Sequence, residues 1–473
     1  MQEIEAVTKQ VLEKITPKKA ERAKVEALSR ELEQKITLAC QQEGLAAIVR
    51  VEGSVAKDTW LSENPDIDVF MRLPKSIPRK NLGDIGLKIA KKAAGDAEQV
   101  ERFAEHPYLQ IFVSGYRVDI VPCYDAKPGE WQSATDRTPY HTDYIKAHLD
   151  MPLRGEVRLL KRFMQGVGVY GAEIKVGGFS GYLCELLVMK YGSFVQVVRA
   201  FAEYNRRVVI DIERFYAGRE KELSLLFPES LVIVDPVDKG RNVASAVQPQ
   251  KLYTFIAAAR AFLIKPAEEF FYPSKTPILS PEALKKQFAS RGSAIVFLVM
   301  GGLDAVPDVL WGQLYRSQRS LHKLLELNDY KVLKDVVWSN EKTLSVFVFE
   351  LEQQELANVT KHLGPPLERE AECKTFLSKY ANNKQVVSGP YIENGRWMVM
   401  LPRKTTDAVT LLKAKLADGG KNAGVAELIA QAIKKNLKVI VNADVLEVYS
   451  DNRDFAVFLT EFLVGKPFWL EAQ

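Results

Sequence analysis

Short apolar runs interrupted by single polar residues mark the strands expected in the first part of the chain. Residues 46–52 predict one strand, and residues 66–71 predict a second in which apolar side chains surround Asp66 and Asp68. Successive side chains of a strand point to opposite faces, so the two carboxylates are expected on one face. Asp119 lies in a third run of the same kind.

Apolar residues at helical spacing predict helices elsewhere in the chain. Residues 1–35 carry one apolar stripe, and residues 81–94 and 143–209 continue the helical pattern, with glycine breaks at 166–168 and 175–178. Three later apolar runs have the length of buried strands: 293–300, 344–351 and 396–401. Separate helices and strands of this kind predict an α+β fold class.

The length and composition indicate a soluble globular protein. With 473 residues the chain is too long for one ordinary core and suggests about three domains. Hydrophobic residues make up 47% and charged residues 26%. No run approaches the roughly 20 apolar residues of a membrane span. The first residues lack the features of a signal peptide, so we expect a cytoplasmic protein without a membrane partner.

The cysteine content and the net charge do not identify a particular chemistry. The four cysteines are scattered, and none pairs at zinc-finger or redox spacing, so they are expected to be reduced apolar residues. A net charge of +5 is too modest to identify a nucleic-acid binder.

The candidate chemistry is metal-assisted nucleotidyl transfer. Mg²⁺ prefers one or two carboxylates together with substrate phosphates, and Asp66 and Asp68 offer such a pair. Two ions about 3.5–4 Å apart stabilise the attacking and leaving oxygens of an in-line displacement. Asp119, on its own strand, is a candidate third ligand.

A phosphate-binding turn is expected directly before these strands. Gly53 allows close approach of the backbone, and the Ser54 hydroxyl and Lys57 ammonium add donors. Taken singly, an Asp-x-Asp pair is more often a solvated strand end, and Gly-Ser is a common loop sequence. The conjunction of the turn, the paired acids and the third acid favours a catalytic site.

Basic residues recur between residues 143 and 209, and a solvated helix face explains most of them. Lys161 is the exception, because it precedes the glycine break and Tyr170 near a domain junction, where ligand sites are common.

Further segments match one known family, densely before residue 250 and sparsely after it. They are residues 53–61, 66–70, 104–108, 118–124, 135–141, 170–173, 178–186, 234–238, 241–244 and 393–397. On these segments the chain resembles the archaeal class I CCA-adding enzymes, which are template-independent tRNA nucleotidyltransferases of the polymerase-β superfamily. The first motif is shared by the whole superfamily, whereas the later segments are more specific to the CCA group.

The resemblance implies three parts within the α+β class. Residues 1–140 would form a polymerase-β-like nucleotidyltransferase head, the catalytic domain. Residues 141–256 would form a helical neck, like the central domain of poly(A) polymerases and oligoadenylate synthetases, with the start of the body, and would bind nucleotide and primer. Residues 257–473 would form an α+β C-terminal body and tail that grip the acceptor stem and elbow of tRNA.

The resemblance also implies roles for individual residues. The catalytic and metal-binding triad, with two Mg²⁺ ions, would be Asp66, Asp68 and Asp119. The nucleotide-binding residues would be Gly53, Ser54, Lys57, His141, Lys161, Tyr170 and Arg241. Of these, Arg241 would help to select the base. Without the resemblance, His141 would be interpreted as a hydrogen-bonded surface histidine and Tyr170 as a packing residue.

Two positions depart from the family pattern. Lys57 stands where the family usually has arginine, and lysine lacks the planar guanidinium that grips phosphate in two places. Asp66 stands where glutamate is frequent. Both substitutions keep the charge, so we expect altered affinity and retained activity.

The implied function is stepwise addition of C, C and A to the tRNA 3′ end, and repair of incomplete ends, from CTP and ATP with release of pyrophosphate. A poly(A) polymerase or oligoadenylate synthetase is the nearer alternative, distinguished by product length and indifference to CTP. A catalytically inactive RNA-binding relative is the more distant one, and the intact acid triad argues against it. The sequence leaves open whether the chain forms a homodimer.

Overall fold

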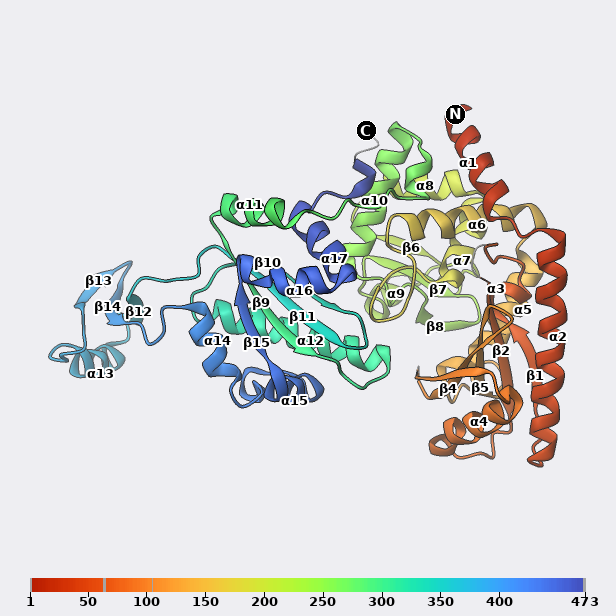
Figure 1. Ribbon diagram of the computed structural model, residues 1–473, viewed down its shortest axis with the longest axis horizontal. Helices are drawn as coiled ribbons and strands as arrows, with labels where there is room; N and C mark the ends of the chain where they lie inside the picture. The colour runs from red at the N-terminus through yellow and green to blue at the C-terminus, as the bar shows by residue number, and fades with distance from the viewer. Residues whose placement is uncertain (1, 63–64, 104, 471–473) are drawn as a thin grey trace. The chain divides into compact units, whose positions relative to one another are not determined.

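The computed structural model describes residues 2–62, 65–103 and 105–470 (Figure 1). These residues form two compact units. The first contains the chain up to Lys275, with Val306–Asp308 and the residues from Lys466 onward. The second contains Thr276–Ala305 and Val309–Gly465.

A five-stranded sheet in the first unit carries the predicted acids. Its strands, in spatial order, are β1 (Ile48–Glu52), β2 (Asp66–Leu73), β5 (Tyr116–Tyr124), β4 (Pro107–Val113) and β3 (Glu98–Phe103). β2 and β5 are parallel, and the other neighbours are antiparallel. Helices α2 (Lys19–Gln42) and α4 (Arg79–Ala94) pack on the face that bears Ile67, Val69 and Met71. Because side chains alternate, Asp66 and Asp68 lie on the other face of β2.

The rest of the first unit is mainly helical. Its helices are α1 (Gln2–Ile15), α3 (Gly53–Ala56), α5 (Thr138–His148), α6 (Met151–Gly166), α7 (Gly181–Tyr191), α8 (Phe194–Ala202), α9 (Glu220–Leu226) and α10 (Pro249–Ile264), with the 3₁₀ turns Ala134–Arg137, Glu268–Phe270 and Phe468–Leu470. A small sheet follows the order β6 (Val208–Ile210), β7 (Leu231–Asp235), β8 (Asp238–Asn242). Phe163 of α6 lies at the centre of the helical core, within 5.3–5.8 Å, between ring centroids, of Phe194, Phe262, Phe270 and Phe271.

The second unit is built on an antiparallel sheet that is buried on both faces. The strand order is β10 (Val332–Ser339), β11 (Leu344–Leu351), β9 (Ala294–Gly301), β15 (Lys438–Val441). In β9, Val296 and Leu298 face a core shared with α12 (Pro307–Glu326), α14 (Ala408–Leu416) and α15 (Glu427–Asn436). Ile295 and Phe297 face a second core with α11 (Pro281–Arg291), the 3₁₀ turn Asn442–Val445, α16 (Leu446–Asp451) and α17 (Arg453–Val464). A short 3₁₀ turn spans Lys421–Ala423.

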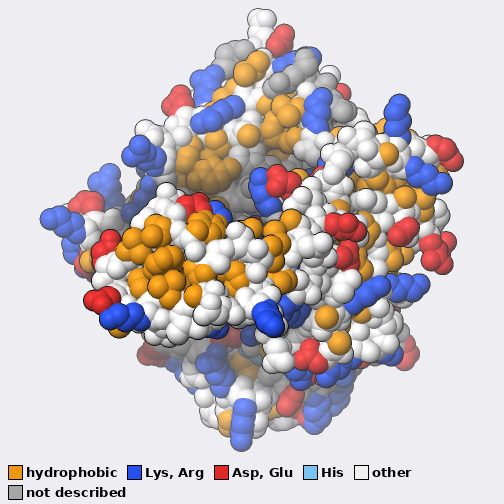
Figure 2. Space-filling model, turned by 90° about the vertical axis from the view of Figure 1, so that its left-hand side faces the viewer, with side chains coloured by type: hydrophobic (Ala, Val, Ile, Leu, Met, Phe, Trp, Pro, Cys, Tyr) orange, Lys and Arg blue, Asp and Glu red, His pale blue; other side chains and the backbone are white. Residues whose placement is uncertain are grey.

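A separate three-stranded sheet belongs to the second unit. Its order is β12 (Val359–Pro366), β14 (Arg396–Pro402), β13 (Ser388–Glu393), and α13 (Glu370–Tyr380) packs on it through Phe376 and Tyr380. The face of the molecule in Figure 2 shows hydrophobic side chains gathered between charged ones. Within this small sheet Leu363 is 62% and Ile392 is 55% exposed.

The structure confirms the α+β class and the predicted strands at 66–71, 344–351 and 396–401 within a residue or two. Two helix predictions were wrong in part. The helix expected over residues 1–35 is broken between Ile15 and Lys19, where Pro17 lacks a backbone N–H. The helical pattern expected up to residue 209 ends with α8, because Val208–Ile210 pairs in parallel with β7.

None of the helices in the described part of the chain is both long and apolar enough to cross a membrane.

Leu298 offers a test of the second core, because it is fully buried in the central strand β9. We expect Leu298→Ala to lower the free energy of unfolding by about 2–5 kcal/mol, because the lost methyl groups leave a cavity. Leu333→Ala, on the edge strand β10 with 50% exposure, should change it by less than about 0.5 kcal/mol. Calorimetric melting of both variants is the measurement, and equal effects would contradict the assigned core.

Candidate active site

Three carboxylates converge where β2 and β5 run side by side. The parallel register pairs Asp68 with Asp119 and Asp66 with Arg117. Paired residues of neighbouring strands project to the same face, so the third acid lies beside the first two, as the sequence predicts. The Arg117 guanidinium pairs with the Asp66 carboxylate, and Gln110 Nε2 donates to Asp119 Oδ1 at 2.8 Å.

Burial raises the pKa values of all three acids. Burial, followed by the charges of Asp119 and Asp66, raises the pKa of Asp68 to about 7, against the opposing effect of Lys57 and Arg117. Partial burial raises the pKa of Asp66, against the effect of Arg117, and burial raises that of Asp119 despite its hydrogen bond from Gln110. The ionised triad is therefore under-compensated by the protein, and added positive charge would stabilise it.

The donor set suits a divalent cation. Carboxylate oxygens are the ligands that Mg²⁺ prefers, and the raised pKa values indicate a site short of positive charge. In the present side-chain arrangement, no three His, Cys, Asp or Glu residues of the described ranges form a group that could hold a metal ion. Asp66 is instead paired with Arg117, and Asp119 with Gln110.

The predicted phosphate-binding turn lies directly against Asp68. β1 ends at Glu52, and Gly53 follows with a φ of +65°. A Cβ atom on Gly53 would lie 1.9 Å from Asp68 Oδ2, so both the backbone conformation and the space require glycine. Ser54 accepts at its carbonyl from the Thr59 N–H at 2.9 Å, which closes the turn.

Lys57 is buried, with its side chain only 6% exposed. Its Nζ donates to Glu185 Oε2 at 2.6 Å, and the Thr59 hydroxyl donates to Glu185 Oε1 at 2.6 Å. Burial by itself would raise the pKa of the Glu185 carboxyl, but Lys57 and then Lys161 hold it below its usual value. An acid on the buried face of α7 is thus stabilised by cations from outside that helix.

Lys161 of α6 meets the same acid. Its Nζ donates to the Thr59 carbonyl at 3.1 Å and to the Thr59 hydroxyl at 3.0 Å, and lies 3.5 Å from Glu185 Oε1. Burial lowers the pKa of Lys161, and Glu185 opposes that shift. A Cβ atom on Gly181 would lie 3.0 Å from the Tyr170 hydroxyl and 3.4 Å from Lys161 Nζ, so both groups lie at the start of α7.

A second network is centred on Asp235, at the end of β7. His141 Nε2 lies 2.9 Å and Arg241 Nη1 2.7 Å from Asp235 Oδ2, while the Tyr182 hydroxyl donates to Oδ1 at 3.1 Å. Burial opposes ionisation of Asp235, but His141 and Arg241 lower its pKa to about 2. Burial also lowers the pKa of His141, against the effect of Asp235.

Tyr182 joins the two networks. Its ring stacks on His141 with centroids 4.1 Å apart, and Lys57 Nζ lies 5.7 Å from the same ring's centroid. The structure therefore places the seven residues predicted to bind nucleotide in one region of the first unit, at the turn and around the two buried acids.

Sequence reasoning missed Glu185, Asp235, Tyr182 and Thr59 as site residues. Glu185 had a usable signal, because an acid between Cys184 and Leu186 in an apolar stretch of helix requires a buried partner. Asp235 follows an apolar strand and gave a weaker signal.

Ala104, the first residue of one matching segment, lies outside the described residues. His106, in the same segment, contacts Ser133 Oγ at 3.1 Å and Thr135 Oγ1 at 3.0 Å.

Three family models match the chain in succession. A nucleotidyltransferase domain matches residues 33–141, the second domain of tRNA nucleotidyltransferase matches residues 155–272, and the C-terminal domain of the CCA-adding enzyme matches residues 291–442. Enzymes with a nucleotidyltransferase domain generally use divalent metal ions.

Curated relatives that match nearly the whole chain agree with the family models. The CCA-adding enzyme of Methanosarcina barkeri is 38% identical over 96% of this chain and 97% of its own length, and that of Methanosarcina mazei is 39% identical over the same shares. A solved cytoplasmic RNA terminal U-transferase is similar at 16% identity, with a TM-score of 0.46, over 59% of this chain and 100% of that chain. The identity to relatives along nearly the whole length shows that this chain belongs to the family of CCA-adding enzymes.

Proposed function

We propose that this protein adds C, C and A stepwise to the 3′ end of tRNA, and repairs incomplete ends, using CTP and ATP without a nucleic-acid template. The observation that carries the proposal is the match to CCA-adding enzymes over 96% of the chain, which includes the C-terminal domain specific to them. The proposed parts are the catalytic head (1–140), the neck and start of the body (141–256) and the tRNA-binding body and tail (257–473).

The reaction is an in-line displacement at phosphorus. The tRNA 3′-hydroxyl oxygen forms a bond to the α-phosphorus of the nucleotide, the bond to the β-phosphate oxygen breaks, and pyrophosphate leaves while the hydroxyl proton passes to solvent. Asp66, Asp68 and Asp119 would hold two Mg²⁺ ions. When bound, these ions supply a lowered pKa for the hydroxyl and charge neutralisation for the pyrophosphate.

Asp66 is available for that role despite its contact with Arg117. The two side chains are 42% and 45% exposed, and exposed ion pairs contribute little to stability. Exchange of the guanidinium for a divalent cation is therefore inexpensive. The shorter Asp66 side chain and the Lys57 point charge are consistent with an altered affinity and a retained activity.

The protein's own groups bind and orient the nucleotide. The Gly53–Ser54 turn and Lys57 would contact the triphosphate, with Lys161, Tyr170 and His141 completing the phosphate and sugar contacts. Arg241, held by Asp235, would donate to the incoming base together with the tRNA terminus. A wrong base leaves buried polar groups unpaired, which is the costly outcome that gives selectivity.

The remaining partners follow from this reaction. tRNA would be bound at its acceptor stem and elbow, mainly by shape and backbone contacts, with marked salt dependence. The proposed location is the cytoplasm, where tRNA substrate is present. Light scattering of the complex with tRNA decides between a monomer and a homodimer.

The direct test is incorporation of labelled CTP and ATP into tRNA transcripts lacking A, CA or CCA, with products sized to one nucleotide. Products that stop after CCA, with C at the first two positions only, are expected. Long adenylate tails would indicate a poly(A) polymerase instead, and tight tRNA binding without incorporation would indicate an inactive RNA-binding relative.

A variant at Asp119 tests whether catalysis and tRNA binding depend on different residues. We expect Asp119→Ala to reduce incorporation by about a thousandfold or more, because a ligand of the proposed metal ions is lost. tRNA affinity in a gel-shift assay should stay within about twofold of the unaltered protein, since the side chain lies in the head and not in the tRNA-binding part. A loss of tRNA binding would contradict this division of roles.

Arg241 tests the assignment of base selection. We expect Arg241→Lys to keep a cation beside Asp235 but to lower the preference for CTP and ATP over GTP and UTP by about tenfold or more, because the planar donors are lost. kcat/KM for each nucleotide is the measurement. Arg137→Lys is the matched control, because the Arg137 guanidinium pairs at 2.8 Å with Asp238, which lies on the same hairpin as Arg241. Equal selectivity in both variants would contradict the assignment.

A further inference from the structure

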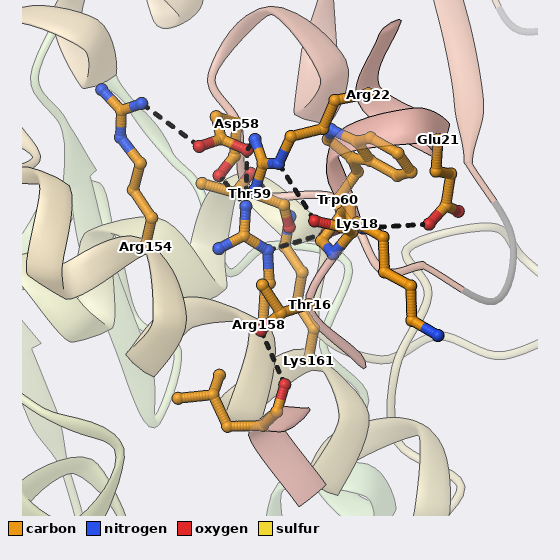
Figure 3. Close-up of polar contacts among 12 residues, drawn as sticks. Thr16, Lys18, Glu21, Arg22, Asp58, Thr59, Trp60, Arg154, Arg158 and Lys161 are labelled. Atoms are coloured by element: carbon orange, nitrogen blue, oxygen red, sulfur yellow. Dashed lines mark hydrogen bonds and ion pairs between the residues drawn. The ribbon is translucent and has the colours of Figure 1, made fainter. Parts of the chain in front are cut away.

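Asp58, immediately after Lys57, is surrounded by three arginines (Figure 3). Its Oδ1 lies 2.5 Å from Arg22 Nη1 and 2.6 Å from Arg158 Nη2, and its Oδ2 lies 3.5 Å from Arg154 Nη1. Asp58 has a φ of +53°, a conformation that aspartate and asparagine tolerate better than most residues. The carboxylate is therefore held in a defined place by groups from α2 and α6.

Arg158 also fixes the backbone of the segment that contains Asp58. Its side chain is only 5% exposed, and it donates to the Asp58 carbonyl at 2.6 Å and to the Trp60 carbonyl at 2.9 Å. Burial lowers the pKa of Arg158, and Asp58 only partly opposes that shift. A buried guanidinium is costly unless its donors are satisfied, so these acceptors are needed for Arg158 to remain there.

Lys161 continues the same pattern one turn further along α6. It donates to the carbonyl and the hydroxyl of Thr59, between the two carbonyls that Arg158 occupies. Arg158 and Lys161 of α6 thus hold three consecutive residues, 58–60, through five hydrogen-bond acceptors: Asp58 O, Asp58 Oδ1, Thr59 O, Thr59 Oγ1 and Trp60 O.

This segment is continuous with the phosphate-binding turn. The Thr59 N–H donates to the Ser54 carbonyl at 2.9 Å, and Lys57 directly precedes Asp58. A shift of residues 58–60 would therefore move Ser54 and Lys57 away from the positions that Glu185 and Asp68 define. Displacements of about 1 Å in groups that position a substrate are enough to weaken its binding and reaction.

We propose that Arg158 and Asp58 are positioning residues that set the triphosphate-binding turn against α6. Neither residue touches the nucleotide; both act through Ser54, Lys57 and Lys161. This inference rests on the proposed function and deepens it. CTP and ATP share the triphosphate and differ in the base, so loss of the Arg158–Asp58 pair weakens both nucleotides by the same factor, in contrast to a change at Arg241.

The test compares Arg158→Lys, Asp58→Asn and the double variant with the unaltered protein. Lysine keeps the charge but cannot donate to Asp58 and Trp60 together, and asparagine keeps the left-handed backbone while removing the charge. We expect the Kd of CTP and of ATP, measured by calorimetry without tRNA, to rise together by about tenfold in each single variant. The double variant should show less than the product of the two effects, because the residues act as one unit.

Steady-state kinetics give the second readout. KM for both nucleotides should rise by the same factor, with the affinity for tRNA unchanged. Arg30→Lys is the control, since Arg30 pairs with Glu26 on the exposed side of α2 and should leave both constants unchanged. A lower melting temperature with unchanged nucleotide Kd values, or a change for only one nucleotide, would overturn the proposal. Asp58→Asn decides the question if Arg158→Lys does not fold.

The unaltered protein, assayed in parallel on tRNA lacking CCA, tests the proposed function separately. Failure of that protein to add CCA refutes the function. Normal CCA addition together with unchanged nucleotide binding in the variants refutes only the role of Arg158 and Asp58.

Discussion

The parallel pairing of β2 with β5 is the constraint on which the site depends. It places Asp68 opposite Asp119, and it concentrates like charges where burial already disfavours ionisation. The antiparallel strands on either side, β1 and β4, do not determine this arrangement. The register between β2 and β5 alone decides which of their residues are adjacent. Two nearby cations, Arg117 and Lys57, oppose this effect, but the pKa of Asp68 stays raised.

The cations of the candidate site are themselves held by buried acids. Lys57 is buried and is held by Glu185, which also serves Lys161. His141 and Arg241 share Asp235 in the same way. Removing one member of such a group would leave an unpaired buried charge, which costs far more than the pair contributes. The positions of the donors in the candidate active site are therefore set by two buried acids, Glu185 and Asp235.

The sequence predicted the parts of the site that depend on local patterns. Alternation placed Asp66 and Asp68 on one face of a strand, and the glycine at residue 53 indicated a close backbone approach, which the contact with Asp68 explains. It did not predict that Lys57 would be buried, because its partner Glu185 lies 128 residues away. The strand at Val208–Ile210 was missed for a related reason, since its short apolar run becomes a strand only by pairing with β7.

Polar contacts at residues 57, 58 and 59 join the first part of the chain to α6 and α7. Lys57 meets Glu185, Asp58 meets Arg158, and Thr59 meets Lys161. All three begin in one segment, directly after the turn against which Asp68 lies. A single segment of the first part is thus fixed by α6 and α7 of the next part. The residues before position 140 supply the three acids, but the groups that hold the turn at Gly53 in place come from α6 and α7, so the arrangement of the candidate site depends on both parts of the chain.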